Sequence, residues 1–280
     1  MRRPIRIVAQ IPPAATPSYA AWRDTILRTE DLGADAIFGY DHFMVPAVTG
    51  RDENGRPITD PNPPVQANFE SWTALASWAE ITSRAELGLL VGGAGFRNPD
   101  LLADMARTVD HISGGRLILG LGAGWYEPDY TEYYEPDYTE YGYRYGTVSS
   151  RHEVFVDALE RIQNRLPKLV PPPLRKIPVL IGGGGEKKTI PVVARFADIW
   201  HTGGELELFV RRNAILVEQT QLIGRDDGEI ERAVSWVSDE AADGFADAGA
   251  TMFTVSVFAP MGGYDLTELK AALAWRDSQR

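Results

Sequence analysis

The chain has 280 residues, of which 44% are hydrophobic and 24% charged, enough for one large α/β domain or two small ones. The net charge of −11 argues against nucleic acid or an anionic membrane as main partner, and the absence of cysteine excludes disulfides, thiolate nucleophiles and cysteine-bound metals. No apolar run approaches the roughly 20 residues of a membrane span, so we expect a cytoplasmic protein that acts on a small molecule.

Short apolar runs rich in β-branched residues alternate with longer helical patterns. This alternation predicts a single-domain (β/α)8 TIM barrel over residues 1–280. The alternative is an open doubly wound sheet, which the lack of a glycine fingerprint after the first strand disfavours. The predicted strands are 5–11, 35–40, 85–91, 116–122, 177–183, 198–203, 232–237 and 251–257, and the predicted helices are 17–32, 68–82, 99–113, 149–166, 187–197, 205–221, 239–249 and 265–277.

Asp41 and His42 follow the second predicted strand, and in a barrel the carboxyl ends of the strands carry the chemistry. A histidine beside a carboxylate at such a place can act as a general base or donate to a ligand. It can equally cap the strand by bonding a loop carbonyl, and both interpretations remain open. The loop at 41–67 far exceeds the usual length of about two to six residues, which is typical of a lid or a substrate wall.

The third predicted strand ends in a glycine-rich exit at 92–95, from which the next helix can begin. Arg97 in this exit can bind an anion, but we expect it to tie the loop to the rim of the barrel. Asp110 and Arg116 flank the turn at 113–115, and we expect their side chains to pair structurally.

The fourth predicted strand ends in GLGAGW at 120–125. Its small residues let a ligand approach the backbone, and Trp125 offers a flat surface for a ring system. A glycine-rich bend that leads the chain out of the barrel explains the same residues.

The octapeptide YEPDYTEY then occurs twice in succession, at 126–133 and 134–141. Stacked repeats need units of roughly 20–50 residues, so we interpret residues 126–141 as a tandem duplication within a loop. Loop closure costs little more for the extra residues, and the barrel should tolerate them. We expect the second copy to add a bulky acidic segment beside the substrate opening. Its spacing matches no EF-hand, which favours a solvated loop over a metal site.

The fifth predicted strand ends in GGGGEKKT, directly before a helix. Backbone N–H groups of such a loop and the helix N-terminus attract anions, and the lysines at 187–188 add positive charge. A phosphate or another anion is therefore favoured over a plain flexible turn. His201 ends the sixth strand, where a structural role is favoured, as it is for His111 and His152 within helical patterns.

The run SGGRLILGLGAGW at 113–125 resembles the luciferase-like flavin and deazaflavin oxidoreductases. Its context fits as well, with RNPDLLADMARTVDHI before it and IPVLIGGGGEKKT further along the chain. The resemblance covers nearly the whole barrel. The sequence is most similar to the branch that uses coenzyme F420 rather than FMN, and the residues at 41–43 and 182–189 support that branch.

This resemblance implies a deazaflavin at the carboxyl face of the barrel. Asp41, Val91, Ala123 and Gly124 would border its ring, a non-proline cis peptide at Leu90–Val91 would push the backbone against the ring, and the GGGGEKKT loop would hold a phosphate of its tail. The cofactor-binding residues expected in this way are Asp41, Leu90, Val91, Gly92, Ala123, Gly124, Trp125, Gly182, Gly183, Gly184, Gly185, Glu186 and Lys187.

The resemblance also implies two catalytic residues. His42 would lie near C5 of the ring and help to move a proton or hydride. Sugar-phosphate dehydrogenases of the family place a glutamate where this chain has Trp125, so Glu127 is the candidate replacement and a sugar-phosphate reaction is disfavoured.

We therefore expect an F420-dependent oxidoreductase that transfers a hydride between C5 of the deazaflavin and a small organic substrate. The alternatives are an FMN-dependent luciferase-like monooxygenase and a non-catalytic protein that binds a flavin or deazaflavin. A phosphate-binding barrel enzyme without a redox cofactor is disfavoured by GLGAGW. Members of this family are often dimers, so a homodimer is a further expectation.

Overall fold

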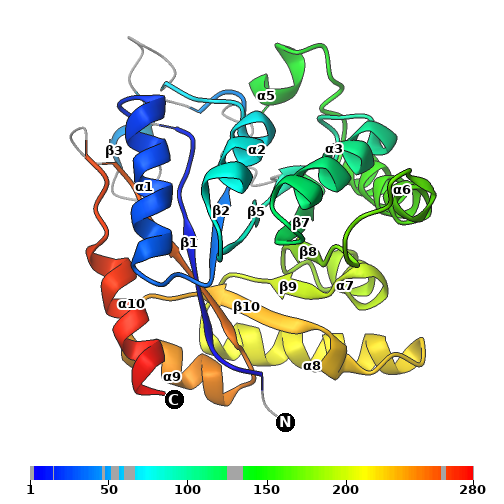
Figure 1. The fold of residues 1–280 in the computed structure, drawn as a ribbon. Helices are drawn as coiled ribbons and strands as arrows, with labels where there is room; N and C mark the ends of the chain where they lie inside the picture. Colours follow the sequence, from blue (N-terminus) through cyan, green and yellow to red (C-terminus); the bar gives the residue numbers. More distant parts are fainter. Residues whose placement is uncertain are drawn as a thin grey trace.

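The computed structural model describes residues 3–14, 16–45, 48–51, 57–59, 67–124, 135–259 and 263–279. Eight parallel strands form a closed barrel, as the sequence predicts (Figure 1). They follow the order β5, β2, β1, β11, β10, β9, β8, β7, and the pairing of β5 with β7 closes the ring. These strands are β1 (Arg6–Gln10), β2 (Ala36–Gly39), β5 (Glu86–Leu89), β7 (Leu117–Gly122), β8 (Val179–Gly182), β9 (Ile199–His201), β10 (Glu231–Ser235) and β11 (Met252–Ser256).

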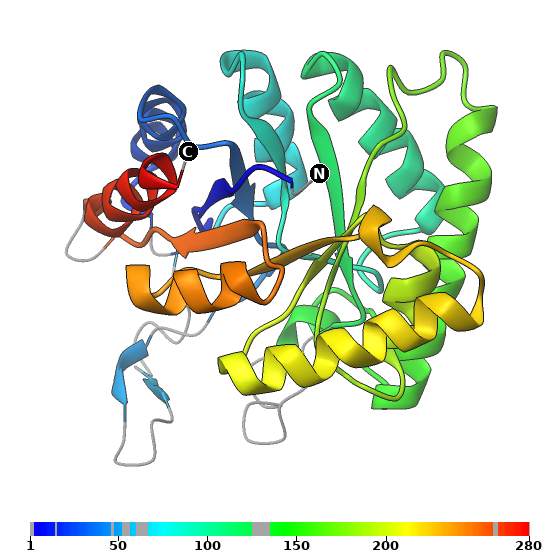
Figure 2. The ribbon, with the colours of Figure 1, turned by 90° about the horizontal axis from the view of Figure 1, so that it is seen from below.

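Each predicted helical pattern is a helix on the outside of the barrel (Figure 2). Several begin at the caps that their sequences provide. Ser18 accepts from the backbone N–H of Ala21, and Asn98 precedes a helix that starts with proline. The helices are α1 (Tyr19–Asp31), α2 (Ser71–Ile81), α3 (Pro99–Ile112), α6 (Val148–Arg165), α7 (Thr189–Phe196), α8 (Leu206–Leu222), α9 (Asp239–Asp247) and α10 (Thr267–Ser278). None of the helices in the described ranges is both long and apolar enough to cross a bilayer.

Several short elements are missing from the sequence prediction because each is too short to show a period. β6 (Gly92–Gly93) continues the line of β5 along β7. An antiparallel hairpin of β3 (Val48–Arg51) and β4 (Pro57–Thr59) lies in the long loop after β2. The turn α5 (Pro136–Thr139) lies within the second octapeptide. The single-turn 3-10 helices are η2 (Leu166–Lys168) and η3 (Asp227–Glu229).

The strands are apolar on both faces because each face meets a separate part of the core. In β1, Ile7 and Ala9 pack against the helices, whereas Val8 points into the barrel with a second cluster that includes Phe38 and Met252. The strands β5 and β7 approach so closely that a Cβ on Gly120 would lie 1.8 Å from the Leu89 carbonyl oxygen. Glycine is therefore required by space at this position.

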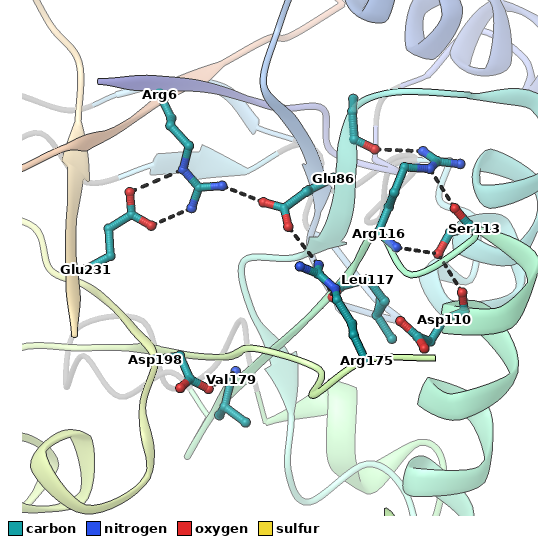
Figure 3. A network of polar contacts seen from close by, with 11 residues as sticks. Arg6, Glu86, Asp110, Ser113, Arg116, Leu117, Arg175, Val179, Asp198 and Glu231 are labelled. Atoms are coloured by element: carbon teal, nitrogen blue, oxygen red, sulfur yellow. Dashed lines mark hydrogen bonds and ion pairs between the residues drawn. The ribbon is translucent and has the colours of Figure 1, made fainter. Parts of the chain in front are cut away.

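Ion pairs close the amino-terminal end of the barrel (Figure 3). The guanidinium of Arg6 contacts both Glu231 and Glu86, and Arg175 lies 2.7 Å from the second of these carboxylates. Although burial acts to lower it, the pKa of Arg6 is raised by these carboxylates. Since this end faces away from the loops that follow the strands, the network serves stability.

The predicted pairing of Asp110 with Arg116 is wrong. Arg116 donates instead to backbone carbonyls, including that of Ser113 at 2.7 Å (Figure 3). The Asp110 carboxylate accepts from the backbone N–H of Leu174 at 2.8 Å. The turn between the two residues folds each side chain onto a different neighbour, so proximity in sequence did not become a contact.

Candidate active site

A cavity of about 1480 Å³ opens at the carboxyl ends of the strands. Its wall contains His42 and every described residue of the expected cofactor-binding set, from Asp41 to Lys187. Trp125 and Glu127 lie outside the described residues and stay predictions. The wall also takes in Asp137 and Tyr138 of the second octapeptide. It further includes residues to which the sequence gave no role in the site, among them Gln10, Phe96, Arg151, Phe155, Arg211, Arg212, Ser235 and Thr254. The fold thus brings together loops from opposite sides of the barrel.

The backbone between β5 and β6 forms one side of this cavity. The Leu90–Val91 peptide is cis, as the resemblance implied, and Gln10 Nε2 donates to the Leu90 carbonyl at 2.8 Å. The Val91 methyl groups press toward two glycines, because added Cβ atoms on Gly122 and Gly182 would lie 2.7 Å and 3.0 Å from them. Three strand ends thus meet in a compact apolar surface with few protruding side chains, which suits contact with a flat ring.

Asp41 is buried and forms part of an ion-pair network at the rim. Arg97 Nη2 lies 3.0 Å from its Oδ1 and also contacts Glu70, while the Gly93 N–H approaches Asp41 Oδ2 at 3.3 Å. Burial raises the pKa of the Asp41 carboxyl, and the effect of Arg97, which lowers it, is smaller. Burial acts to lower the pKa of Arg97, but the carboxylates of Asp41 and Glu70 raise it. The prediction that Arg97 ties the loop to the rim is confirmed.

His42 lies in the cavity wall with its imidazole held by a carboxylate. Its Nδ1 is 2.5 Å from Asp137 Oδ2, and the other oxygen of Asp137 accepts from the backbone N–H groups of Phe43 at 2.8 Å and Met44 at 2.6 Å. In addition, Asn68 Nδ2 donates to the His42 carbonyl at 2.6 Å. The loop that carries His42 is therefore fixed at both its side chain and its backbone.

The second octapeptide contributes two buried residues to the cavity wall. Asp137 is 1% exposed and Tyr138 4%. The Tyr138 ring contacts Phe96, and its hydroxyl lies 2.3 Å from where a Cβ on Gly124 would stand. Burial raises the pKa of Tyr138 to about 12. These residues of the second copy therefore do not form the solvated acidic segment at the opening that the sequence led us to expect. Acidity and proline content gave no signal of burial.

The loop after β8 lines the cavity with residues 182–189. Within the described chain, no backbone carbonyl accepts from the N–H groups of residues 184–188. The Gly185 carbonyl instead accepts from the first two residues of α7, at 2.8 Å and 3.0 Å. Because α7 begins here, its dipole adds positive potential to these N–H groups. Unbonded N–H groups at a helix start are what the predicted anion site requires, and anion binding here stays a prediction.

Two arginines of α8 lie beside this loop, which we call the anion loop after its predicted ligand, and the sequence did not indicate them. The guanidinium of Arg212 lies against Gly184, 2.4 Å from where a Cβ would stand, and donates to the Gly203 carbonyl at 2.8 Å. Arg211 pairs with Glu186 at 2.5 Å, so this carboxylate holds a guanidinium. In the sequence, neither arginine can be distinguished from the other charged residues on the exposed face of a long surface helix.

His201 lines the cavity at the end of β9. Its Nε2 is 3.1 Å from Thr254 Oγ1, and burial lowers its pKa to about 4. The imidazole is thus neutral at physiological pH, and it lines the cavity rather than serving only as a strand cap. His111 and His152 are partly exposed and bond backbone carbonyls, which fits the predicted structural role for His111, whereas His152 also lines the cavity.

Comparison with known proteins gives a family and two kinds of structural relative. The model of the luciferase-like monooxygenase family matches residues 4–238. The phthiodiolone/phenolphthiodiolone dimycocerosates ketoreductase of Mycobacterium tuberculosis is 35% identical over 105 residues, which are 36% of this chain and 28% of that protein. The chain thus matches less than a third of the length of this relative.

Among solved structures, an F420-dependent secondary alcohol dehydrogenase in complex with an F420–acetone adduct is similar with a TM-score of 0.74 at 14% identity, over 91% of this chain and 93% of that one. The oxygenating constituent of 3,6-diketocamphane monooxygenase from Pseudomonas putida, in complex with FMN, has a TM-score of 0.59 at 14% identity, over 84% and 67%. At 14% identity, these similarities show only that the fold is shared. One of these two proteins uses F420 and the other binds FMN, so the fold does not identify the cofactor.

Proposed function

The chain belongs to the luciferase-like monooxygenase family, and on that premise we propose that it is an F420-dependent oxidoreductase acting on a ketone or a secondary alcohol. The observation that carries the proposal is the arrangement of the cavity. The anion loop lies on one side of it, the apolar surface at Leu90–Val91 forms another, and His42 stands in the same wall. A cofactor with an anionic tail and a flat ring fits these features.

The residues present fit such a cofactor. The open N–H groups at 184–188, together with Lys187 and Arg212, would hold a phosphate of its tail. Val91 and Gly124 would contact the ring, because both line the cavity at a place where the backbone lies close to the cavity wall. Bound F420 supplies or accepts a hydride at C5.

The substrate class follows from the proton chemistry of His42 and from two similar proteins. Oxidation of a secondary alcohol removes a hydride from carbon and a proton from oxygen, and reduction of a ketone returns both. A neutral imidazole can take the proton and return it. The ketoreductase and the secondary alcohol dehydrogenase, as their names state, act on these two forms of one group. Their likeness supports this class.

The deciding experiment is parallel titration of the purified protein with oxidised F420 and with FMN, followed by tryptophan fluorescence. We expect F420 to bind more tightly, and Arg212→Leu to weaken that binding about tenfold or more through loss of a charge-assisted contact. Arg23→Leu is the matched control, because Arg23 lies on α1 beside Asp24 and outside the cavity wall, yet its loss changes the net charge equally.

Each outcome of the titration has a clear meaning. A preference for FMN would replace the proposal with an oxygen-using monooxygenase. F420 binding without turnover of any ketone or secondary alcohol would leave a cofactor-binding protein of another activity. If neither compound binds, the proposed cofactor is wrong.

A further inference from the structure

The contact between His42 and Asp137 determines which ring nitrogen carries the proton. Nδ1 of His42 lies 2.5 Å from Asp137 Oδ2, and the carboxylate is 1% exposed. Its other oxygen already accepts from two backbone N–H groups of the same loop. An ionised carboxylate can only accept hydrogen bonds, so whenever the imidazole carries a single proton, that proton is on Nδ1. The lone pair is then on Nε2.

The surrounding packing holds Asp137 in this position. The adjacent Tyr138 is buried against Phe96 and Tyr145, and the Tyr141 ring lies 4.6 Å from that of Phe43, next to His42. The octapeptide is therefore docked on both sides of its aspartate. Side chains on rigid surroundings hold a partner in one orientation better than mobile ones do.

The two octapeptides are identical, but the residues that follow them differ. After the second copy comes Gly142 with φ of +72°, and the backbone N–H of Tyr143 donates to the Tyr138 carbonyl at 2.8 Å. After the first copy the corresponding residues are Tyr134 and Glu135. A tyrosine disfavours a left-handed backbone that glycine adopts freely, so the second copy is the one suited to this docking.

We infer that Asp137 is a positioning residue that fixes the Nδ1–H tautomer and the orientation of His42, and that the second copy of the duplicated octapeptide supplies it. For its catalytic consequence the inference rests on the proposed function. His42 Nε2, with its lone pair, takes the proton from the hydroxyl of a secondary alcohol and returns it to the oxygen of a ketone. The tautomer itself is a property of the protein without any ligand.

The substitution Asp137→Asn tests this inference without removing the docked segment. The Asn carbonyl oxygen can still accept from Phe43 and Met44, but its NH2 group must donate to His42 Nδ1. The proton of the imidazole then moves to Nε2. Nitrogen-15 NMR of the imidazoles in the cofactor-free protein distinguishes the tautomers. The chain has only four histidines, and the signals lost in His42→Gln identify those of His42.

The first copy provides a matched control. Asp129 occupies the same place in the first octapeptide as Asp137 in the second. We expect wild type and Asp129→Asn to show the Nδ1–H tautomer, and both Asp137→Asn and the double variant to show Nε2–H. A change in the double variant only would overturn the assignment to the second copy, because the first copy would then replace it. An Nε2–H tautomer in wild type would overturn the inference without any variant.

Activity gives the second readout. With a substrate that turns over, we expect Asp137→Asn to lower kcat by about 10²–10⁴-fold, the range of a general acid–base group, while the cofactor Kd stays close to that of wild type. An unchanged kcat beside a changed tautomer would overturn the catalytic part. Failure of the proposed function is recognised separately, since wild type would then bind no F420 although the NMR result stands.

Discussion

His201 should make the stability of the ligand-free protein depend on pH. The ordinary pKa of its imidazole is 6.5, and burial at the end of β9 lowers it to about 4. Between these values the unfolded chain binds a proton that the folded chain does not, so stability rises with pH across this window and falls as the solution becomes more acidic. The effect is complete below about pH 4, where both states are protonated.

The magnitude follows from the two pKa values. On going from about pH 7.5 to about pH 5.5, the unfolded imidazole gains most of a proton while the folded one stays neutral, which lowers the free energy of unfolding by about 1.3 kcal/mol. The figure hardly changes for any folded pKa below about 5, because the folded ring is then almost unprotonated at both ends of this range. It is therefore insensitive to the depth of burial.

The assay is urea unfolding at both pH values, followed by tryptophan fluorescence, for wild type, His201→Gln and His111→Gln. Other titrating groups contribute equally to all three proteins, so only the difference between them matters. We expect the loss on acidification to be smaller by about 1.3 kcal/mol in His201→Gln than in wild type. His111→Gln, which replaces a partly exposed ring bonded to the Pro172 carbonyl, is the control substitution. Parallel changes in all three proteins would refute the low pKa of His201.

Three further substitutions test the packing. Arg6→Met should lower the free energy of unfolding by about 2–4 kcal/mol, since it leaves two carboxylates without their shared guanidinium, and a loss below about 1 kcal/mol in urea unfolding would contradict this. Gly120→Ala should lower the free energy of unfolding by more than about 3 kcal/mol or abolish folding, because its Cβ would meet the Leu89 carbonyl. The control Gly203→Ala, with open space around it, should change the free energy of unfolding by less than about 0.5 kcal/mol. Similar thermal midpoints for both variants would be inconsistent with the close approach of the strands. Tyr138→Phe removes a buried hydroxyl that has no hydrogen-bond partner among the described residues, so stability should stay the same or rise by up to about 1 kcal/mol. A fall would mean that the hydroxyl is bonded.

The barrel could be predicted from the sequence because its signal is local. Each of the eight predicted strands is a barrel strand within a few residues of its expected bounds. A strand buried on both faces is a short apolar run, and it is easily distinguished from the longer helical patterns on either side. The loop after β8 and the helix start that follows it were predictable for the same reason, as the glycines, lysines and helix start are consecutive, while anion binding by this loop stays a prediction. The cis peptide at Leu90–Val91 came from resemblance alone.

The missed parts of the site depend on contacts between distant residues. Asp137 and His42 are 95 positions apart, and an aspartate in an acidic, proline-containing run gives no sign of burial. Arg212 reaches Gly184 from the surface of α8, where its charge follows the usual amphipathic pattern. Periodicity specifies which face of an element is buried, but it does not say which side chains of two separate elements will meet. The roles predicted for Trp125 and Glu127 stay predictions.

The distribution of charge bears on how quickly a ligand finds the cavity. The chain as a whole has a net charge of −11, yet Lys187, Lys188, Arg211 and Arg212 gather at one part of the cavity wall. Most of the surface therefore repels an approaching anion, and the field near the anion loop draws it in. Such steering acts on the encounter rather than on the bound state, so rising ionic strength should slow association much more than it speeds dissociation.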